Sequence, residues 1–154
     1  MSDAGLPPCG LYRTTQAIGE QVPAGRLVYF HNHGDPGPGV YLPTGWRQNR
    51  ALFDAQGVLL PGRWWAASLD PLAAEGFYRV RETFFCCDKR CQTFEVDQLV
   101  QLGYTAEAEP LVFVPEVIDG VLIIPDQGAR VDRSRLAKLH ALKTPVSSTE
   151  PGLQ

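Results

Sequence analysis

Two histidines and a group of cysteines are the residues of this chain whose types and spacing could do chemistry. Residues 30–43 read FHNHGDPGPGVYLP, so that one residue separates His31 from His33. In a β-strand, side chains at positions i and i+2 point to the same face, so both imidazoles could bind one ion while Asn32 points away. Imidazole and thiolate are ligands that zinc prefers in proteins.

The cysteines are concentrated in FFCCDKRCQTF, residues 84–94, where the pattern favours the tip of a hairpin. The cysteines of this hairpin are Cys86, Cys87 and Cys91. Lys89 and Arg90 between them favour the thiolate, which is the form that attacks or binds a metal. The spacing is not that of a zinc finger, because no C-x-x-C pair is present.

Three interpretations of these residues are open. Two of the three cysteines and the two histidines could complete a tetrahedral zinc site, which would exist once per chain. The cysteine hairpin could instead be redox-active by itself. Alternatively, the histidines are polar strand-end residues and the cysteines are half-buried apolar ones, so that no cofactor is bound. No complete catalytic constellation follows, and we assign no catalytic residue.

Tryptophan and arginine form a second group, because all three tryptophans lie within residues 46–65. The candidate partner-binding residues are Trp46, Arg47, Arg50, Arg63, Trp64 and Trp65. These residue types dominate binding hot spots, and they can stack on one another. The alternative is that tryptophans fill the core, and we expect burial of Trp46 and of at least one of the adjacent pair Trp64 and Trp65. The other ring of that pair should lie at a surface or interface.

The elements that must position these residues are short β-strands. Glycine (15) and proline (13) interrupt runs of β-branched and aromatic residues, a pattern typical of an all-β domain. The expected strands are residues 11–15, 26–32, 40–42, 50–54, 58–60, 77–85, 98–104, 111–114 and 121–124.

Three motifs recur in the same order in both halves of the chain. The recurring pairs are GLYR at 10–13 with GFYR at 76–79, residues 27–43 with 99–115, and GVLLP at 57–61 with GVLIIP at 120–125. We therefore predict a mainly β, internally duplicated protein of small antiparallel barrels, either two SH3-like units or one pseudo-twofold barrel. Units of this size are marginal alone, so the halves should share a core or a broad apolar interface.

The expected organisation is an N-terminal extension (1–9), a first β unit (10–75), a second β unit with a C-terminal helix (76–143) and a disordered tail (144–154). Leucines at three-residue steps predict that short helix; they are Leu136, Leu139 and Leu142. Each unit has one insertion that the other lacks. These are the cysteine hairpin in the second unit and TGWRQNRALFDAQ in the first.

Composition restricts the class of function. Net charge is −3, apolar residues make up 44% and charged residues 20%, so we expect a compact soluble protein without a field that attracts nucleic acid or anionic lipid. No apolar stretch is long enough to span a membrane, and the N-terminus has no signal-peptide pattern, which favours a cytoplasmic location.

The leading hypothesis is a non-enzymatic interaction module that recognises a protein partner, or its own second copy, through the Trp/Arg residues and the hairpin tips. The alternative is a zinc-binding or thiol-redox protein that uses His31, His33 and the cysteine hairpin. Binding of single-stranded nucleic acid through small barrels and exposed aromatic residues is a third hypothesis, which the acidic balance disfavours.

Overall fold

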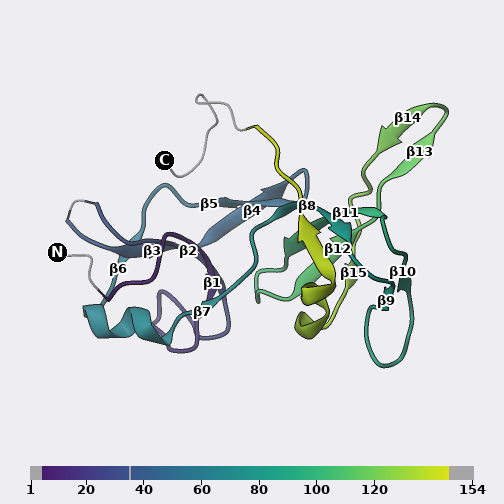
Figure 1. Ribbon diagram of the computed structural model, residues 1–154. Coiled ribbons are helices and arrows are strands. Elements are labelled where there is room, and N and C mark those ends of the chain that lie inside the picture. The colour runs from purple at the N-terminus through teal and green to yellow at the C-terminus, as the bar shows by residue number, and fades with distance from the viewer. Residues whose placement is uncertain (1–4, 35, 146–154) are drawn as a thin grey trace.

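The computed structural model describes residues 5–34 and 36–145 and consists mainly of antiparallel β-sheet (Figure 1). The strands of the first five-stranded sheet, in spatial order, are β6 (Val58–Leu59), β3 (Gly39–Tyr41), β2 (Leu27–His31), β1 (Gly10–Arg13) and β7 (Asp70–Pro71). Those of the second are β15 (Ala129–Arg130), β12 (Pro110–Phe113), β11 (Leu99–Tyr104), β8 (Gly76–Val80) and β16 (Leu139–Ala141). Both sheets therefore have the same strand order.

Three two-stranded hairpins and two 3-10 helices complete the fold. The hairpins are β4 (Pro43–Arg47) with β5 (Arg50–Phe53), β9 (Phe84–Phe85) with β10 (Thr93–Phe94), and β13 (Glu116–Ile118) with β14 (Val121–Ile123). The 3-10 helices, η1 (Arg63–Ser68) and η2 (Arg133–Lys138), each precede the last strand of a sheet. No helix in residues 5–34 and 36–145 is long and apolar enough to span a bilayer.

The residues of the first two recurring motifs pair in the same register in both sheets. Tyr12 lies opposite Val28 in the first sheet, and Tyr78 lies opposite Val100 in the second. Each of these tyrosines also donates its hydroxyl hydrogen to the carbonyl oxygen four residues earlier, at 2.7 Å and 2.6 Å. The strand centres are equivalent not only in sequence but also in their hydrogen bonds.

The third recurring motif pairs strands that are not equivalent, which corrects that alignment. Val58–Leu59 is β6 of the first sheet, whereas Val121–Ile123 is β14 of a separate hairpin. The strand that occupies the place of β6 in the second sheet is Ala129–Arg130. Short apolar runs between glycine and proline resemble one another whichever strand they form. The insertion at β4–β5 consequently has a counterpart in β13–β14.

The predicted C-terminal helix is a short 3-10 helix followed by a strand. Leu136 is in η2, but Leu139 pairs with Val80 as part of β16, and Leu142 is exposed. A three-residue leucine spacing does not distinguish a short 3-10 helix followed by a strand from an α-helix. Residues 1–4 of the predicted extension and 146–154 of the predicted tail lie outside the described residues.

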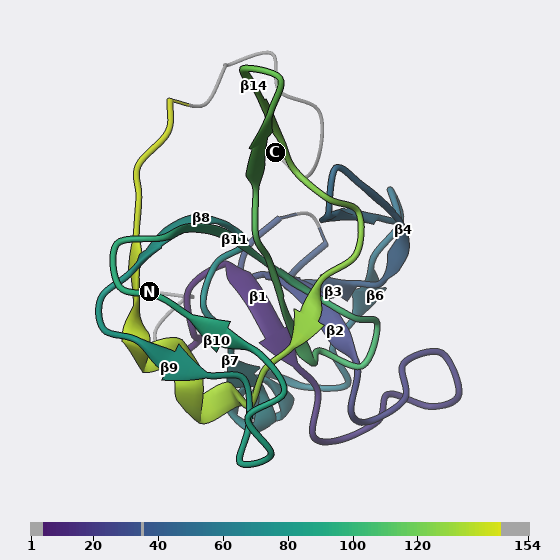
Figure 2. The same cartoon turned by 90° about the vertical axis from the view of Figure 1, so that its right-hand side faces the viewer.

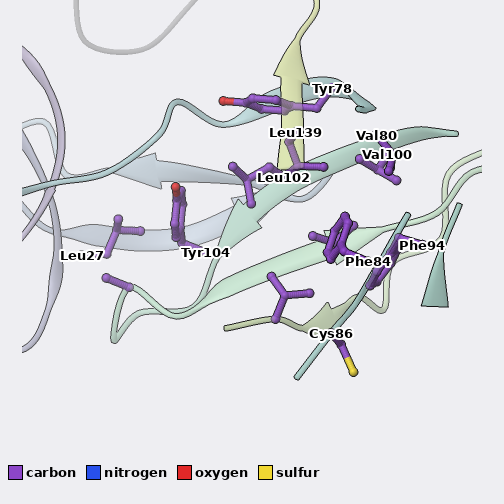
Figure 3. Packing of buried hydrophobic residues seen from close by; sticks show 13 residues of the cluster. Leu27, Tyr78, Val80, Phe84, Cys86, Phe94, Val100, Leu102, Tyr104 and Leu139 are labelled. Carbon is purple, nitrogen blue, oxygen red and sulfur yellow. The ribbon is translucent and has the colours of Figure 1, made fainter. Parts of the chain in front are cut away.

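Each sheet has its own apolar core, and the core of the second sheet includes a residue of the first. The second core contains Tyr78, Phe84, Phe94, Leu102 and Tyr104 together with Leu27, which comes from β2 of the first sheet (Figure 3). Leu27 is fully buried, and its amide donates to the Ala106 carbonyl oxygen at 2.8 Å. One strand of the first sheet therefore contributes directly to the second core.

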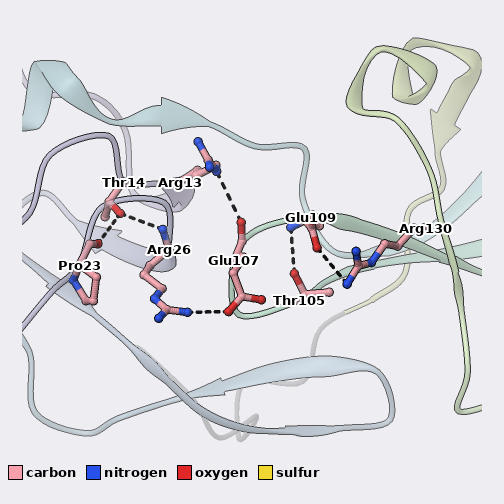
Figure 4. Close-up of polar contacts among 8 residues, drawn as sticks. All are labelled: Arg13, Thr14, Pro23, Arg26, Thr105, Glu107, Glu109 and Arg130. Atoms are coloured by element: carbon pink, nitrogen blue, oxygen red, sulfur yellow. Dashed lines mark hydrogen bonds and ion pairs between the residues drawn. The ribbon is translucent and has the colours of Figure 1, made fainter. Parts of the chain in front are cut away.

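Charged side chains reinforce this junction (Figure 4). Arg26 forms an ion pair with Glu107 at 2.5 Å, and Arg13 donates to the Glu107 carbonyl oxygen at 3.5 Å. At another point of the junction, Arg133 pairs with Asp70 at 2.6 Å and thereby lowers the pKa of that carboxyl group. These pairs are partly exposed, so the apolar contact contributes more to stability than they do.

Candidate functional site

Cys9, His31 and His33 converge at one end of the first sheet. The Cys9 Sγ lies 3.9 Å from His31 Nδ1 and 4.0 Å from His33 Nδ1, and the two imidazole centroids are 4.1 Å apart. Gly10 pairs with Phe30 across β1 and β2, which places the preceding residue, Cys9, beside His31. Three potential metal ligands from two separate segments thus meet.

The structure does not bring together the histidines and the cysteine hairpin, which one of the three interpretations combined in a zinc site. His31 ends β2 at one end of the molecule, whereas Cys86, Cys87 and Cys91 lie around β9 and β10 at the other end (Figure 1). The unassigned Cys9 takes their place beside the histidines. Asn32 also departs from the expected outward position: strand geometry ends at His31, and the Asn32 Oδ1 lies 3.3 Å from the Cys9 thiol.

The three cysteines of the second half form a cluster of their own. Cys86 is buried, Cys87 is half-buried and Cys91 is exposed, and the Sγ atoms of Cys86 and Cys87 are 3.5 Å apart. Hydrogen bonds from the Cys86 thiol and from the backbone amides of Lys89 and Cys91 lower the pKa of Cys87. Interaction with Cys87 raises the pKa of Cys91. The cluster therefore contains one thiol that ionises more readily than its exposed neighbour.

Because a larger fraction of Cys87 is thiolate at neutral pH, we expect iodoacetamide to alkylate Cys87 faster than Cys91. The rate at Cys87 should also reach its plateau at a lower pH than in an unfolded peptide. Timed alkylation followed by peptide mass spectrometry measures both. In Cys86→Ala the main hydrogen bond to Cys87 is missing, so its rate profile should move to higher pH. Equal rates at Cys87 and Cys91 would contradict the assignment.

The candidate partner-binding residues lie in two places. Trp46, Arg47 and Arg50 are on the β4–β5 hairpin, and the others are on η1, which Figure 1 shows at the opposite side of the first sheet. Trp64 and Trp65 divide as expected, with exposed fractions of 65% and 0%. Trp46 is 42% exposed, contrary to the expected burial, and its indole N–H donates to the Tyr104 carbonyl oxygen at 3.0 Å.

The β4–β5 hairpin bridges the two halves. At its turn, the Asn49 side chain donates to Gln101 Oε1 and to the Pro125 carbonyl oxygen, both at 2.9 Å. The Gln101 side chain donates in return to the Gln48 carbonyl oxygen at 3.0 Å. This segment of the first unit thus has a structural role within the chain, while Arg47 and Arg50 remain exposed.

The exposed apolar hairpin is a surface that sequence reasoning did not identify. We use this name for β13–β14 with Ile124, and its large aliphatic residues are Val117, Ile118, Val121, Leu122, Ile123 and Ile124. Their exposed fractions run from 38% to 69%. The hairpin projects from the molecule in both views (Figures 1 and 2). The signal was present in EVIDGVLIIP, where apolar residues do not alternate with polar ones as in a strand with one buried face.

Three separate features are candidate functional sites. They are the group of Cys9, His31 and His33, the cysteine hairpin and the exposed apolar hairpin. The first two offer metal-binding or redox-active groups, and the third offers a binding surface. A scan of protein-family models, a search of curated proteins and a search of solved structures found no significant match to the chain.

Proposed function

We propose that this protein is an interaction module that associates with a second copy of itself through the exposed apolar hairpin. The observation that carries the proposal is that both faces of this hairpin are apolar. Val117 lies opposite Leu122, so these side chains share one face, whereas the Ile118 and Val121 pair lies on the other. An isolated hairpin of this kind is marginally stable in water, and large exposed apolar patches mark interaction sites.

Charge distribution favours a second copy as the partner. The only charged residues of the exposed apolar hairpin are Glu116 and Asp119, both acidic. The neighbouring β4–β5 turn is flanked by Arg47 and Arg50, and residues 43–53 contain no acid. Among the ion pairs of the described residues, none involves these four charges. A twofold contact could bring the acids of one copy to the arginines of the other, while the aliphatic side chains cover one another.

The two similar sheets would serve as a rigid scaffold that carries the β4–β5 and β13–β14 hairpins. We infer that the two units arose by duplication of an SH3-like unit, because strand order, register and the 3-10 turn before the last strand agree. In the first unit, the hairpin that follows the third strand is partly covered by the second unit. The corresponding hairpin of the second unit has no such cover within the described chain.

The double variant Val117→Thr, Leu122→Thr tests the proposal. Threonine retains strand propensity while it reduces apolar area, so the fold should persist. Two side chains in each of two copies, at about 1 kcal/mol each, give about 4 kcal/mol, or close to a 1000-fold weaker dimer. Sedimentation equilibrium measures the dissociation constant, and circular dichroism checks the fold.

The matched control is Trp64→Thr, which removes a larger exposed apolar side chain on η1, away from the hairpin. This control should leave self-association unchanged. If it abolished association instead, the interface would lie at η1, with Arg63 and Trp64. A wild-type protein that stays monomeric at about 100 μM, far above a micromolar dissociation constant, would refute self-association.

A further inference from the structure

We propose that Cys9, His31 and His33 bind a single zinc ion, with the fourth coordination position open to solvent. The three donor atoms are Cys9 Sγ and the Nδ1 atoms of the two imidazoles, and each nitrogen lies within 4.0 Å of the sulfur. In a tetrahedral zinc site, sulfur and nitrogen ligands lie about 3.6 Å apart. Each sulfur–nitrogen distance therefore needs to shorten by only a few tenths of an ångström, and all three donor atoms already lie within 4.8 Å of one another.

The fold orients both the thiol and the first histidine. Gly34 has a φ of +123°, and a Cβ at this position would lie 3.3 Å from His31 Cδ2 and 3.6 Å from Nε2. Only a glycine allows the turn to lie against this edge of the ring, which leaves Nδ1 facing Cys9. The backbone amide of Asn32 donates a hydrogen bond to the Cys9 Sγ at 3.3 Å, which holds the sulfur beside the histidines.

Asn32 organises the cluster without being one of the proposed ligands. Its side-chain amide donates to the Pro7 carbonyl oxygen at 3.0 Å, and its Oδ1 lies 2.7 Å from His33 Nδ1 and 3.3 Å from Cys9 Sγ. In the metal-free protein, Oδ1 thus accepts hydrogen bonds from the Cys9 S–H and from the His33 Nδ1–H. Metal binding removes both contacts, because Zn²⁺ replaces the thiol proton, which passes to solvent, and His33 shifts its proton to Nε2.

The donor set selects the metal. One thiolate and two neutral imidazoles suit zinc or cobalt, whereas magnesium and calcium require oxygen ligands. His33 is exposed, so water can reach the fourth position, as in zinc sites with three protein ligands. The corresponding positions of the second unit are Glu75, Gly103 and Thr105, which cannot form this set. One site of this kind per chain is therefore expected.

Cobalt absorption spectroscopy on protein without a histidine tag tests this site. The background variant Cys87→Ser, Cys91→Ser removes the accessible thiols of the other cluster. We expect one equivalent of Co²⁺ to give a thiolate-to-cobalt charge-transfer band and intense tetrahedral d–d bands, both displaced by zinc. Cys9→Ser should remove the charge-transfer band, and His31→Ala or His33→Ala should weaken binding by more than about 100-fold, beyond the usual effect of an outer-shell change.

His140→Ala is the matched control, because His140 is the remaining histidine and lies exposed on β16. Its cobalt spectrum and affinity should equal those of the background variant. Circular dichroism of each variant shows whether the loss of the cobalt spectrum is due to unfolding. If His33→Ala is unfolded, the milder substitution His33→Gln is used in its place. A charge-transfer band that survives Cys9→Ser, or no cobalt binding by the folded background variant, would overturn the proposal. Neither outcome depends on self-association.

Discussion

Replacement of Trp65 with alanine is expected to lower the free energy of unfolding by about 3–5 kcal/mol. Trp65 is fully buried and is the largest side chain of the first core, where it packs with Phe30, Val40 and Leu69. Its removal leaves a cavity that short strands and a 3-10 turn cannot close. Urea denaturation followed by circular dichroism measures the loss.

Trp64→Ala is the control for this prediction, since the same chemical change is made one residue away. Trp64 is 65% exposed, so the expected change in the free energy of unfolding is within about 0.5 kcal/mol. Comparable losses at the two positions would contradict the assignment of Trp65 alone to the core.

Trp65→Phe separates apolar packing from hydrogen bonding at the same position. The buried Trp65 Nε1 has no hydrogen-bond partner among the described residues. Phenylalanine removes this unsatisfied group, whose burial costs about 1–3 kcal/mol, and it retains most of the apolar contact. Trp65→Phe should therefore be much less destabilising than Trp65→Ala.

The strands were the most predictable part of the fold. Each of the nine predicted strands overlaps at least one strand of the structure, because runs such as LVYFH and LVQLGY between turn residues leave few alternatives. The two-residue strands β7, β10 and β15 were missed, and so were the longer strands β4, β13 and β16. No local pattern marks a segment of two residues.

The candidate sites were less predictable, for physical reasons that differ between them. Cys9 joins the histidines only because β1 pairs with β2 in one particular register, which a lone cysteine before a strand does not indicate. Trp46 was expected to be buried but is partly exposed. Its position depends on how the two sheets pack, because its indole N–H donates to the Tyr104 carbonyl oxygen of the second sheet, and no local pattern shows this. His31 and His33 do lie together, as the spacing predicted, but β2 ends at His31 and a bend of the chain, not a continuous strand, places His33 beside it.

Substitution of Gly103, where β11 contacts the β4–β5 turn, is the second change for which we expect a large effect on stability. A Cβ at Gly103 would lie 2.7 Å from the Asn49 carbonyl oxygen and 3.3 Å from Phe113 Cε1. Gly103→Ala should therefore push the β4–β5 turn away from β11 and lower the free energy of unfolding by about 1–3 kcal/mol. Gly45→Ala is the matched control within β4, because a Cβ there meets no atom within 4 Å.

A double-mutant cycle with Asn49→Gly shows whether Gly103→Ala acts by displacing this turn. Asn49 has a positive φ of 68°, which glycine accepts, so this substitution removes mainly the hydrogen bonds to Gln101 and Pro125. If the turn has already moved in Gly103→Ala, these hydrogen bonds are already broken in that variant. The decreases in the free energy of unfolding caused by the two substitutions should then be clearly less than additive. Urea denaturation of the four proteins measures the coupling. Additive losses, or a Gly103→Ala variant as stable as Gly45→Ala, would mean that the turn does not hold the units together.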